Sequence, residues 1–179
     1  MIELINSIDI ATMEFVQNNL HNPIMDKVMI FITSLGDAGF IWILIALGLL
    51  INKKYRKVGI TLLVALVLGV ILGNGILKNI IERSRPFINM EGINLLIKAP
   101  TSYSFPSGHT TSSFAAALVL SMNFKNKTVY IFILAALIAF SRVYLGVHFP
   151  TDIIAGIILG LSCGYIAIFI GKKISQRNV

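Results

Sequence analysis

The stretch from residue 58 to residue 77 contains no charged side chain and is almost entirely apolar. A hydrocarbon core about 30 Å thick is crossed by roughly 20 apolar helical residues, so this stretch is long enough to cross a membrane as one helix. Residues 129–140, which continue apolar to about Val147, and residues 153–170 are predicted to do the same. Residues 39–51 form a shorter run that begins at about Leu35 and ends before two lysines, and we predict a fourth span there.

The composition also indicates a membrane protein. Of the 179 residues, 56% are hydrophobic and 13% are charged, and the mean hydropathy is +0.83, whereas a soluble domain carries roughly 25% charged residues. A fifth run, residues 112–124, is rich in small residues that permit close helix packing, and we predict a span packed among the others. We therefore expect an all-α fold, a polytopic membrane helical bundle of about five to six transmembrane helices with N-terminal surface helices.

The first third of the chain differs from the rest. Residues 2–20 mix apolar and acidic side chains at three- and four-residue spacing, which is typical of an amphipathic surface helix. Residues 23–34 form an apolar helix too short to cross alone; alternatively, residues 26–51 hold one tilted or broken span. We expect one integral membrane domain over residues 1–179, with interfacial elements in 1–34, a helical core in 35–171 and a cytoplasmic tail in 172–179.

Basic residues outnumber acidic ones and give a net charge of +7. They lie in small groups between apolar runs, so nucleic acid explains this charge poorly and the enrichment of Lys and Arg in cytoplasmic loops explains it better. If five spans alternate in direction, nine cations fall on the side expected to be cytoplasmic: Lys53, Lys54, Arg56, Lys57, Lys125, Lys127, Lys172, Lys173 and Arg177. The three polar clusters of the chain then all fall on the outer side.

These clusters are Lys78-x6-Arg85-Pro86, Pro106-Ser107-Gly108-His109 and Ser141-Arg142-x5-His148-x3-Asp152. Charged groups near lipid are costly unless they are paired or face a water-filled cavity, so this many of them in an apolar chain indicate function. Together they supply three fixed cations, two histidines and a carboxylate, which are the groups needed to bind a phosphate and attack it without a metal. The sequence has no cysteine cluster and no His-x3-His pair, and we expect neither a metal site nor a cofactor.

The first two clusters each allow a functional and a plainer interpretation. Lys78 and Arg85 lie nearly two helical turns apart on one face, where they suit phosphate oxygens, but such cations are also common at a membrane interface. Ser107 is a good N-cap at a helix start that attracts anions, and Gly108 lets the backbone approach a ligand. His109 in the first turn could protonate a leaving oxygen; the alternative is an ordinary cap with an interfacial histidine.

The third cluster brings a cation, a histidine and a carboxylate together in one short loop. Asp152 can hold His148 in the tautomer whose other ring nitrogen is nucleophilic, with Arg142 nearby. The alternative is a helix-capping aspartate beside a loop histidine. Three such clusters on one side of the membrane are harder to explain by packing than any one of them.

In their order and spacing, the three clusters resemble the signature of the type 2 phosphatidic acid phosphatase superfamily, and every position of that signature is filled between residues 78 and 152. The resemblance implies a phosphohistidine mechanism in which His148 attacks phosphorus, Asp152 holds its tautomer and His109 protonates the leaving group. It also implies that the phosphoryl oxygens are bound by Lys78, Arg85, Ser107, Gly108 and Arg142. The apolar composition argues against the soluble vanadium haloperoxidases of this superfamily, and the short chain argues against glucose-6-phosphatase.

What remains is a lipid phosphatase expected in the bacterial plasma membrane with an outward-facing site. Undecaprenyl pyrophosphate is favoured because that lipid is left on the outer leaflet; phosphatidylglycerol phosphate or phosphatidate, with broad specificity, is the alternative. The motif hints conflict, since Pro-Ser-Gly-His resembles the phosphatidylglycerol-phosphate branch and the pattern before Asp26 resembles the undecaprenyl pyrophosphatases. A non-catalytic lipid binder or transporter, a phosphotransferase with an acceptor other than water, and the oligomeric state stay open.

Two further features each have two interpretations. The apolar loop 87–105 could border a lipid entrance or pack over the helix ends. The ridge Gly156-x3-Gly160-x3-Gly164 could face another span or another subunit, and packing within the chain is favoured.

Overall fold

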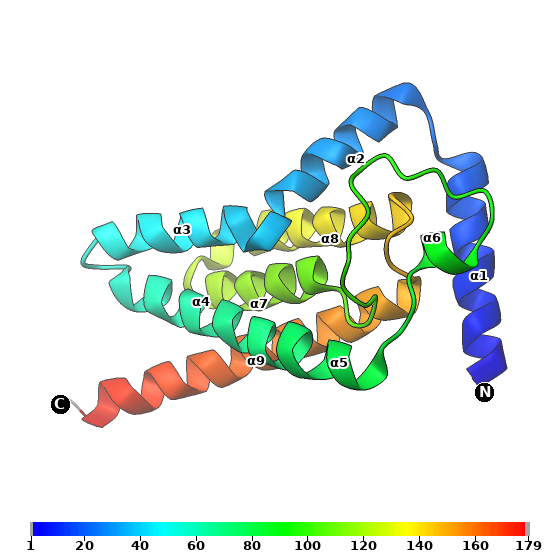
Figure 1. The fold of residues 1–179 in the computed structure, drawn as a ribbon. Coiled ribbons are helices and arrows are strands. Elements are labelled where there is room, and N and C mark those ends of the chain that lie inside the picture. The colour runs from blue at the N-terminus through cyan, green and yellow to red at the C-terminus, as the bar shows by residue number, and fades with distance from the viewer. Residues whose placement is uncertain (1, 178–179) are drawn as a thin grey trace.

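The computed structural model describes the backbone of residues 2–177 and the side chains of residues 3–173, and every regular element in that range is helical (Figure 1). The predicted all-α class is confirmed. The long helices of the bundle are α3 (Phe40–Ile51), α4 (Arg56–Gly69), α7 (Gly108–Asn123), α8 (Thr128–Tyr144) and α9 (Pro150–Arg177). α4 continues without a break through η2 (Val70–Leu77), where the helix widens into π-type turns, and α5 (Lys78–Ile81).

Three segments of the described chain are long and apolar enough to cross a membrane. They are Arg56–Asn89, Lys125–Tyr144, which includes η3 (Lys125–Lys127), and Pro150–Lys173. The predicted spans at 58–77, 129–140 and 153–170 fall within them.

The predicted fourth span differs in form. α3 is joined to α2 (Pro23–Leu35) through η1 (Asp37–Gly39), and the pair is bent by 45°. The bent pair counts as a fourth span only if α2 and α3 cross the membrane together as one broken helix. This arrangement is the broken-span alternative given for residues 26–51. The total of five to six spans stays a prediction.

α7 lies at the centre of the bundle. Its 16 residues rise about 24 Å, less than the hydrocarbon core of about 30 Å, and its middle turns are buried alanines packed against α4, α8 and α9. A side chain at Gly160 would meet the carbonyl oxygen of Thr111 at 2.5 Å, and Gly156 and Gly164 approach α7 almost as closely. The glycine ridge of α9 therefore packs against α7 within the chain, as favoured from the sequence.

α1 (Ile2–Asn19) lies across one end of the bundle instead of along it (Figure 1). Met13 and Val16 pack under the α8–α9 turn, while Leu4 and Phe15 stay exposed, so the helix is amphipathic as predicted. One of its acidic residues departs from that pattern, because Asp9 is almost fully buried.

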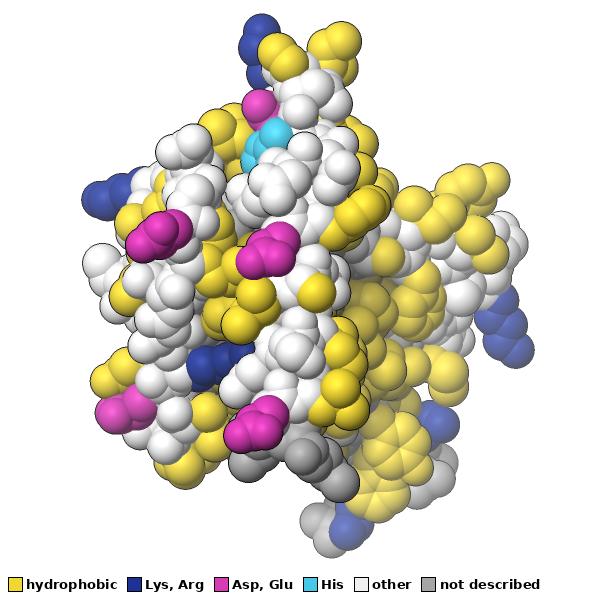
Figure 2. All heavy atoms as spheres, turned by 90° about the vertical axis from the view of Figure 1, so that its right-hand side faces the viewer, with side chains coloured by type: hydrophobic (Ala, Val, Ile, Leu, Met, Phe, Trp, Pro, Cys, Tyr) yellow, Lys and Arg dark blue, Asp and Glu magenta, His cyan; other side chains and the backbone are white. Residues whose placement is uncertain are grey.

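The loop after α5, with its short helix α6 (Pro86–Asn89), covers the same end of the bundle (Figure 1). Its apolar side chains pack against the buried cluster formed by α1, α2 and the α8–α9 turn, which favours packing over the helix ends; they are Phe87, Met90, Ile93, Leu95 and Ile97. Figure 2 shows that this face carries acidic side chains scattered among polar and apolar ones. The α3–α4 turn and the far end of α9, which hold most of the counted cations, lie at the opposite end (Figure 1); the side chain of Arg177 is outside the described residues.

Candidate active site

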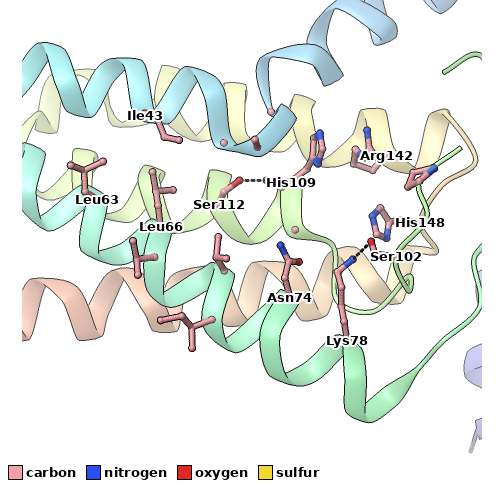
Figure 3. A pocket seen from close by; sticks show the side chains of 18 of the residues that line it. Ile43, Leu63, Leu66, Asn74, Lys78, Ser102, His109, Ser112, Arg142 and His148 are labelled. Carbon is pink, nitrogen blue, oxygen red and sulfur yellow. Dashed lines mark hydrogen bonds between the residues drawn. The ribbon is translucent and has the colours of Figure 1, made fainter. Parts of the chain in front are cut away.

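The three polar clusters meet in one cavity of about 550 Å³ inside the bundle, bordered by Pro100 and Ser102 of the covering loop (Figure 3). Each cluster sits where a helix starts or ends on this side of the bundle, which is why residues far apart in the sequence converge. The side chains of Lys78, Arg85, His109, Arg142 and His148 all line the cavity.

His148 and Asp152 form a buried pair, but a third residue lies between them. The distance from His148 Nδ1 to Asp152 Oδ2 is 3.5 Å, which is long for a direct hydrogen bond. The hydroxyl of Ser104 donates to Asp152 Oδ2 at 2.5 Å and lies 3.3 Å from His148 Nδ1. Nothing in the sequence marks Ser104, since no spacing rule singles out one serine in a loop.

The contacts of His148 select one tautomer. Arg85 NH1 lies 3.3 Å from His148 Nε2, and because a guanidinium can only donate, Nε2 must accept. The ring proton then sits on Nδ1, toward Ser104 and Asp152. Burial, opposed in part by the hydrogen bond with Asp152, lowers the pKa of His148 from 6.5 to about 3, so the imidazole is neutral near pH 7 and its Nε2 lone pair is available.

The three cations of the cavity bind backbone and hydroxyl groups. Lys78 Nζ donates to the Tyr103 carbonyl oxygen at 2.7 Å, and Arg85 donates to the carbonyl oxygens of Ser102 and Val147, each at 2.7 Å. Among the described residues, neither these two nor Arg142 forms an ion pair with a carboxylate. Buried charge of one sign without a counter-charge is stabilised when an anion binds.

Arg142 is the clearest case. It is 4% exposed and donates to Thr33 Oγ1 at 2.5 Å, and its Nε has no partner in the part of the chain that the structure describes. A buried donor without an acceptor is rare and costly in native proteins. An oxyanion in the cavity would supply that acceptor.

Ser107 caps α7, as predicted, and its hydroxyl accepts from Thr110 N at 3.4 Å and from Thr110 Oγ1 at 3.0 Å. It is fully buried and does not line the cavity, whereas Gly108 does. For the Ser107 side chain, the geometry favours the plainer interpretation of a helix cap.

His109 faces a second carboxylate that the sequence analysis did not single out. Its Nε2 lies 2.9 Å from Asp37 Oδ1 in the elbow between α2 and α3. A side chain at Gly36 would come within 2.6 Å of the His109 ring, so the elbow fits the ring only with glycine there. Asp37 is invisible to motif analysis because the elbow meets α7 only in the folded bundle.

Away from the cations, the cavity continues between α3 and α4 along apolar side chains (Figure 3). The walls of this apolar part are formed by Ile43, Leu63, Leu66, Val67, Val70 and Ile71. Within the described residues, no group of three or more His, Cys, Asp or Glu side chains is arranged to hold a metal ion. A site that is cationic at one end and apolar at the other suits an amphiphile with an anionic headgroup.

The fold and this cavity define an all-helical membrane protein with a buried group of cations beside a buried histidine. Residues 58–175 match the model of the PAP2 superfamily. The chain belongs to this superfamily, and it is a lipid phosphatase, as predicted from the three motifs.

Three relatives illustrate the match. An undecaprenyl-diphosphatase of Sulfolobus acidocaldarius is 36% identical over 85% of this chain and 76% of its own length. The crystal structure of LpxE from Aquifex aeolicus covers 89% of this chain and 93% of its own, at 33% identity and a TM-score of 0.78. The crystal structure of a transmembrane PAP2-type phosphatidylglycerolphosphate phosphatase from Bacillus subtilis covers 96% of this chain and 88% of its own, at 29% identity and a TM-score of 0.78.

Proposed function

We propose that the protein hydrolyses the pyrophosphate of undecaprenyl pyrophosphate, releasing inorganic phosphate and undecaprenyl phosphate, through a phosphohistidine at His148. The observation that carries this proposal is the cavity in which His148 Nε2 faces Arg85 at the cationic end of an apolar channel. A non-catalytic lipid binder has no need for a buried neutral histidine whose second nitrogen is held by a serine and a carboxylate.

In the first step, His148 Nε2 forms a bond to phosphorus while the bond from phosphorus to the leaving oxygen breaks. The Nδ1 proton stays on the ring, and Asp152 stabilises the resulting cation through Ser104 and through its own carboxylate. His109, which lines the cavity and is oriented by Asp37, enters this step protonated, gives that proton to the leaving oxygen and becomes neutral.

In the second step, a water molecule attacks phosphorus and the bond between phosphorus and Nε2 breaks. His109 takes the proton of that water, and inorganic phosphate leaves with His148 neutral again. Lys78, Arg85 and Arg142 bind the oxygens whose charge grows in both transition states, together with the backbone at Gly108. Ser107 contributes by capping the helix start that presents this backbone.

The choice of lipid rests on the channel and on the side of the membrane. The apolar walls between α3 and α4 suit a hydrocarbon chain attached directly to the phosphate-bearing end. The cation-rich turns lie at the opposite end of the bundle, which supports a site on the outer face of a bacterial plasma membrane, where undecaprenyl pyrophosphate is left. Phosphatidylglycerol phosphate is the second candidate, supported by the structural likeness to the Bacillus subtilis enzyme.

The test is phosphate release by purified protein in detergent with a chelator present. We compare kcat/KM for three lipids: undecaprenyl pyrophosphate, phosphatidylglycerol phosphate and phosphatidate. The proteins are wild type, His148→Asn and the matched control His21→Asn, which changes the one histidine outside the cavity. We expect release by wild type and the control, highest for undecaprenyl pyrophosphate, and almost none by His148→Asn. Full activity of His148→Asn would refute the mechanism, and a preference for another lipid would refute the substrate.

A further inference from the structure

Arg83 joins the N-terminal helix to the predicted catalytic carboxylate. Its NH2 group donates to Asp9 Oδ2 on α1 at 2.6 Å, and its NH1 group donates to Asp152 Oδ1 at 2.6 Å. NH1 also donates to Thr151 Oγ1 at 2.7 Å, and the guanidinium lies 4.3 Å from the centre of the Phe149 ring. Neither Arg83 nor Asp9 belongs to the three motifs found in the sequence.

Asp9 is placed in an unusual way for a surface helix. It is 1% exposed, and every polar contact of its carboxylate reaches another segment: Arg83, the backbone N–H of Thr151 at 3.0 Å and the Thr151 hydroxyl at 2.5 Å. Burying a carboxylate is costly unless it is paired and hydrogen-bonded. A residue that served only to attach α1 to the bundle could be apolar, as Met13 and Val16 are.

The contact of Arg83 with Asp152 fixes the direction of the carboxylate. Oδ1 is held by the guanidinium, so Oδ2 is left to accept from Ser104 and from the Phe149 N–H at 2.9 Å, on the side of His148 Nδ1. Without the Oδ1 contact the carboxylate is held through Oδ2 alone, and a rotation about its Cβ–Cγ bond would shift Oδ2 relative to the histidine. The fork geometry of arginine suits this task because its two terminal nitrogens reach two carboxylates at once.

We infer that Arg83 is a positioning residue for the proposed phosphatase reaction, and that Asp9 holds it, so that the N-terminal helix α1 sets the orientation of Asp152 and through it of His148. This inference rests on the proposed function. Neither Arg83 nor Asp9 lines the cavity, so both act on catalysis without touching the substrate. The prediction that separates this role from substrate binding is a loss in kcat with little change in KM.

The experiment measures kcat and KM for undecaprenyl pyrophosphate with Arg83→Gln, Arg83→Lys, Asp9→Asn and the double variant Asp9→Asn/Arg83→Gln. Glu14→Gln on α1 and Lys98→Gln in the covering loop are the matched controls, since both side chains are exposed. Each variant is also inhibited with orthovanadate, which mimics the transition-state geometry, and with inorganic phosphate, which does not. The melting temperature in detergent reports folding, and Asp9→Asn, which keeps the side-chain shape, remains informative if Arg83→Gln does not fold.

We expect Arg83→Gln to lower kcat by about 10- to 100-fold, the effect of losing one charge-assisted hydrogen bond, with KM within about threefold. Arg83→Lys should recover part of this loss in kcat, and Asp9→Asn should lower kcat by a smaller factor. In the double variant, Asp9→Asn should lower kcat by less than about twofold beyond Arg83→Gln alone. Inhibition by vanadate should weaken while inhibition by phosphate is unchanged, and both controls should match wild type.

Four results would each overturn the positioning role while the phosphatase assignment stands. They are an unchanged kcat in Arg83→Gln, a rise in its KM alone, equal weakening of inhibition by vanadate and by phosphate, and full additivity of the two losses in the double variant. A wild-type protein that releases no phosphate from any of the three lipids would overturn both proposals.

Discussion

Replacement of Ser104 by alanine tests whether the hydroxyl between His148 and Asp152 takes part in catalysis. In the folded protein this hydroxyl donates to Asp152 Oδ2 at 2.5 Å and lies 3.3 Å from His148 Nδ1, while the direct distance between the pair is 3.5 Å. A hydrogen bond to a charged group contributes about 1.5–3 kcal/mol, which corresponds to about a 10- to 150-fold loss of rate. Asp152 keeps its contacts with Arg83 and the Phe149 N–H and can move closer to the ring, so we expect the lower end, a loss in kcat of about tenfold.

The assay is steady-state phosphate release, with kcat and KM determined separately for Ser104→Ala. Ser84→Ala is the matched control because Ser84 is an exposed serine of the same loop. KM should change little, since Ser104 does not line the cavity. A Ser104→Ala protein with the kcat of wild type would refute the reasoning, because His148 and Asp152 would then be sufficient as a pair.

Three further predictions concern acid catalysis, pH and topology. Asp37→Asn removes the charge beside His109 Nε2. The loss in kcat should be larger for a phosphomonoester than for a pyrophosphate, because an alkoxide leaving group depends on protonation more than a phosphate leaving group does. Equal losses for both substrates would contradict the role of Asp37 in acid catalysis by His109. Burial lowers the pKa of His148 in the folded protein from 6.5 to about 3, so the unfolded chain takes up a proton first as the pH falls. The melting temperature in detergent should therefore fall as the pH is lowered from 7 toward 4, and it should fall less in His148→Asn. Equal falls in both proteins would contradict this prediction. The single native cysteine is buried, so it should not react with a membrane-impermeant maleimide applied to intact cells. The reagent should label Lys98→Cys and not Lys53→Cys. The reverse pattern would put the cavity on the cytoplasmic side of the membrane.

Much of the fold follows from properties that act locally along the chain. The spans are long uncharged runs, and the three motifs gather because each stands where a helix starts or ends on the same side of the bundle. The segments predicted at 58–77, 129–140 and 153–170 are found for this reason. The 39–51 run is less regular because the bend at η1 divides it from α2, and a bend of 45° between two apolar helices leaves no clear mark on hydropathy.

The residues that the sequence analysis missed share another property. Ser104, Asp37 and Arg83 meet the motif residues across segments that are distant in sequence. Asp9 is the extreme case, since it contacts Thr151 across 142 positions of the chain. Its burial depends on how α1 lies across the α8–α9 turn, which helical periodicity does not encode. A polar residue on an amphipathic helix is predicted to face solvent, and only tertiary packing reverses that.

Ser107 shows how a motif leaves the role of a side chain open. Its place in the motif implied contact with the phosphoryl oxygens, yet its hydroxyl is bound to Thr110 in the first turn of α7. A motif gives residue identities, and two roles compatible with one position are separated only by where the side chain points.

The most direct test of the account is to trap the covalent intermediate. Wild type, His148→Asn and His109→Asn are mixed with lipid pyrophosphate labelled in the terminal phosphate and quenched in alkali, in which a phosphohistidine survives, and the labelled peptide is identified by mass spectrometry. The account predicts label on His148 in wild type, none in His148→Asn, and slower labelling in His109→Asn. Phosphate release by wild type without any phosphoenzyme, or label that persists in His148→Asn, would contradict it.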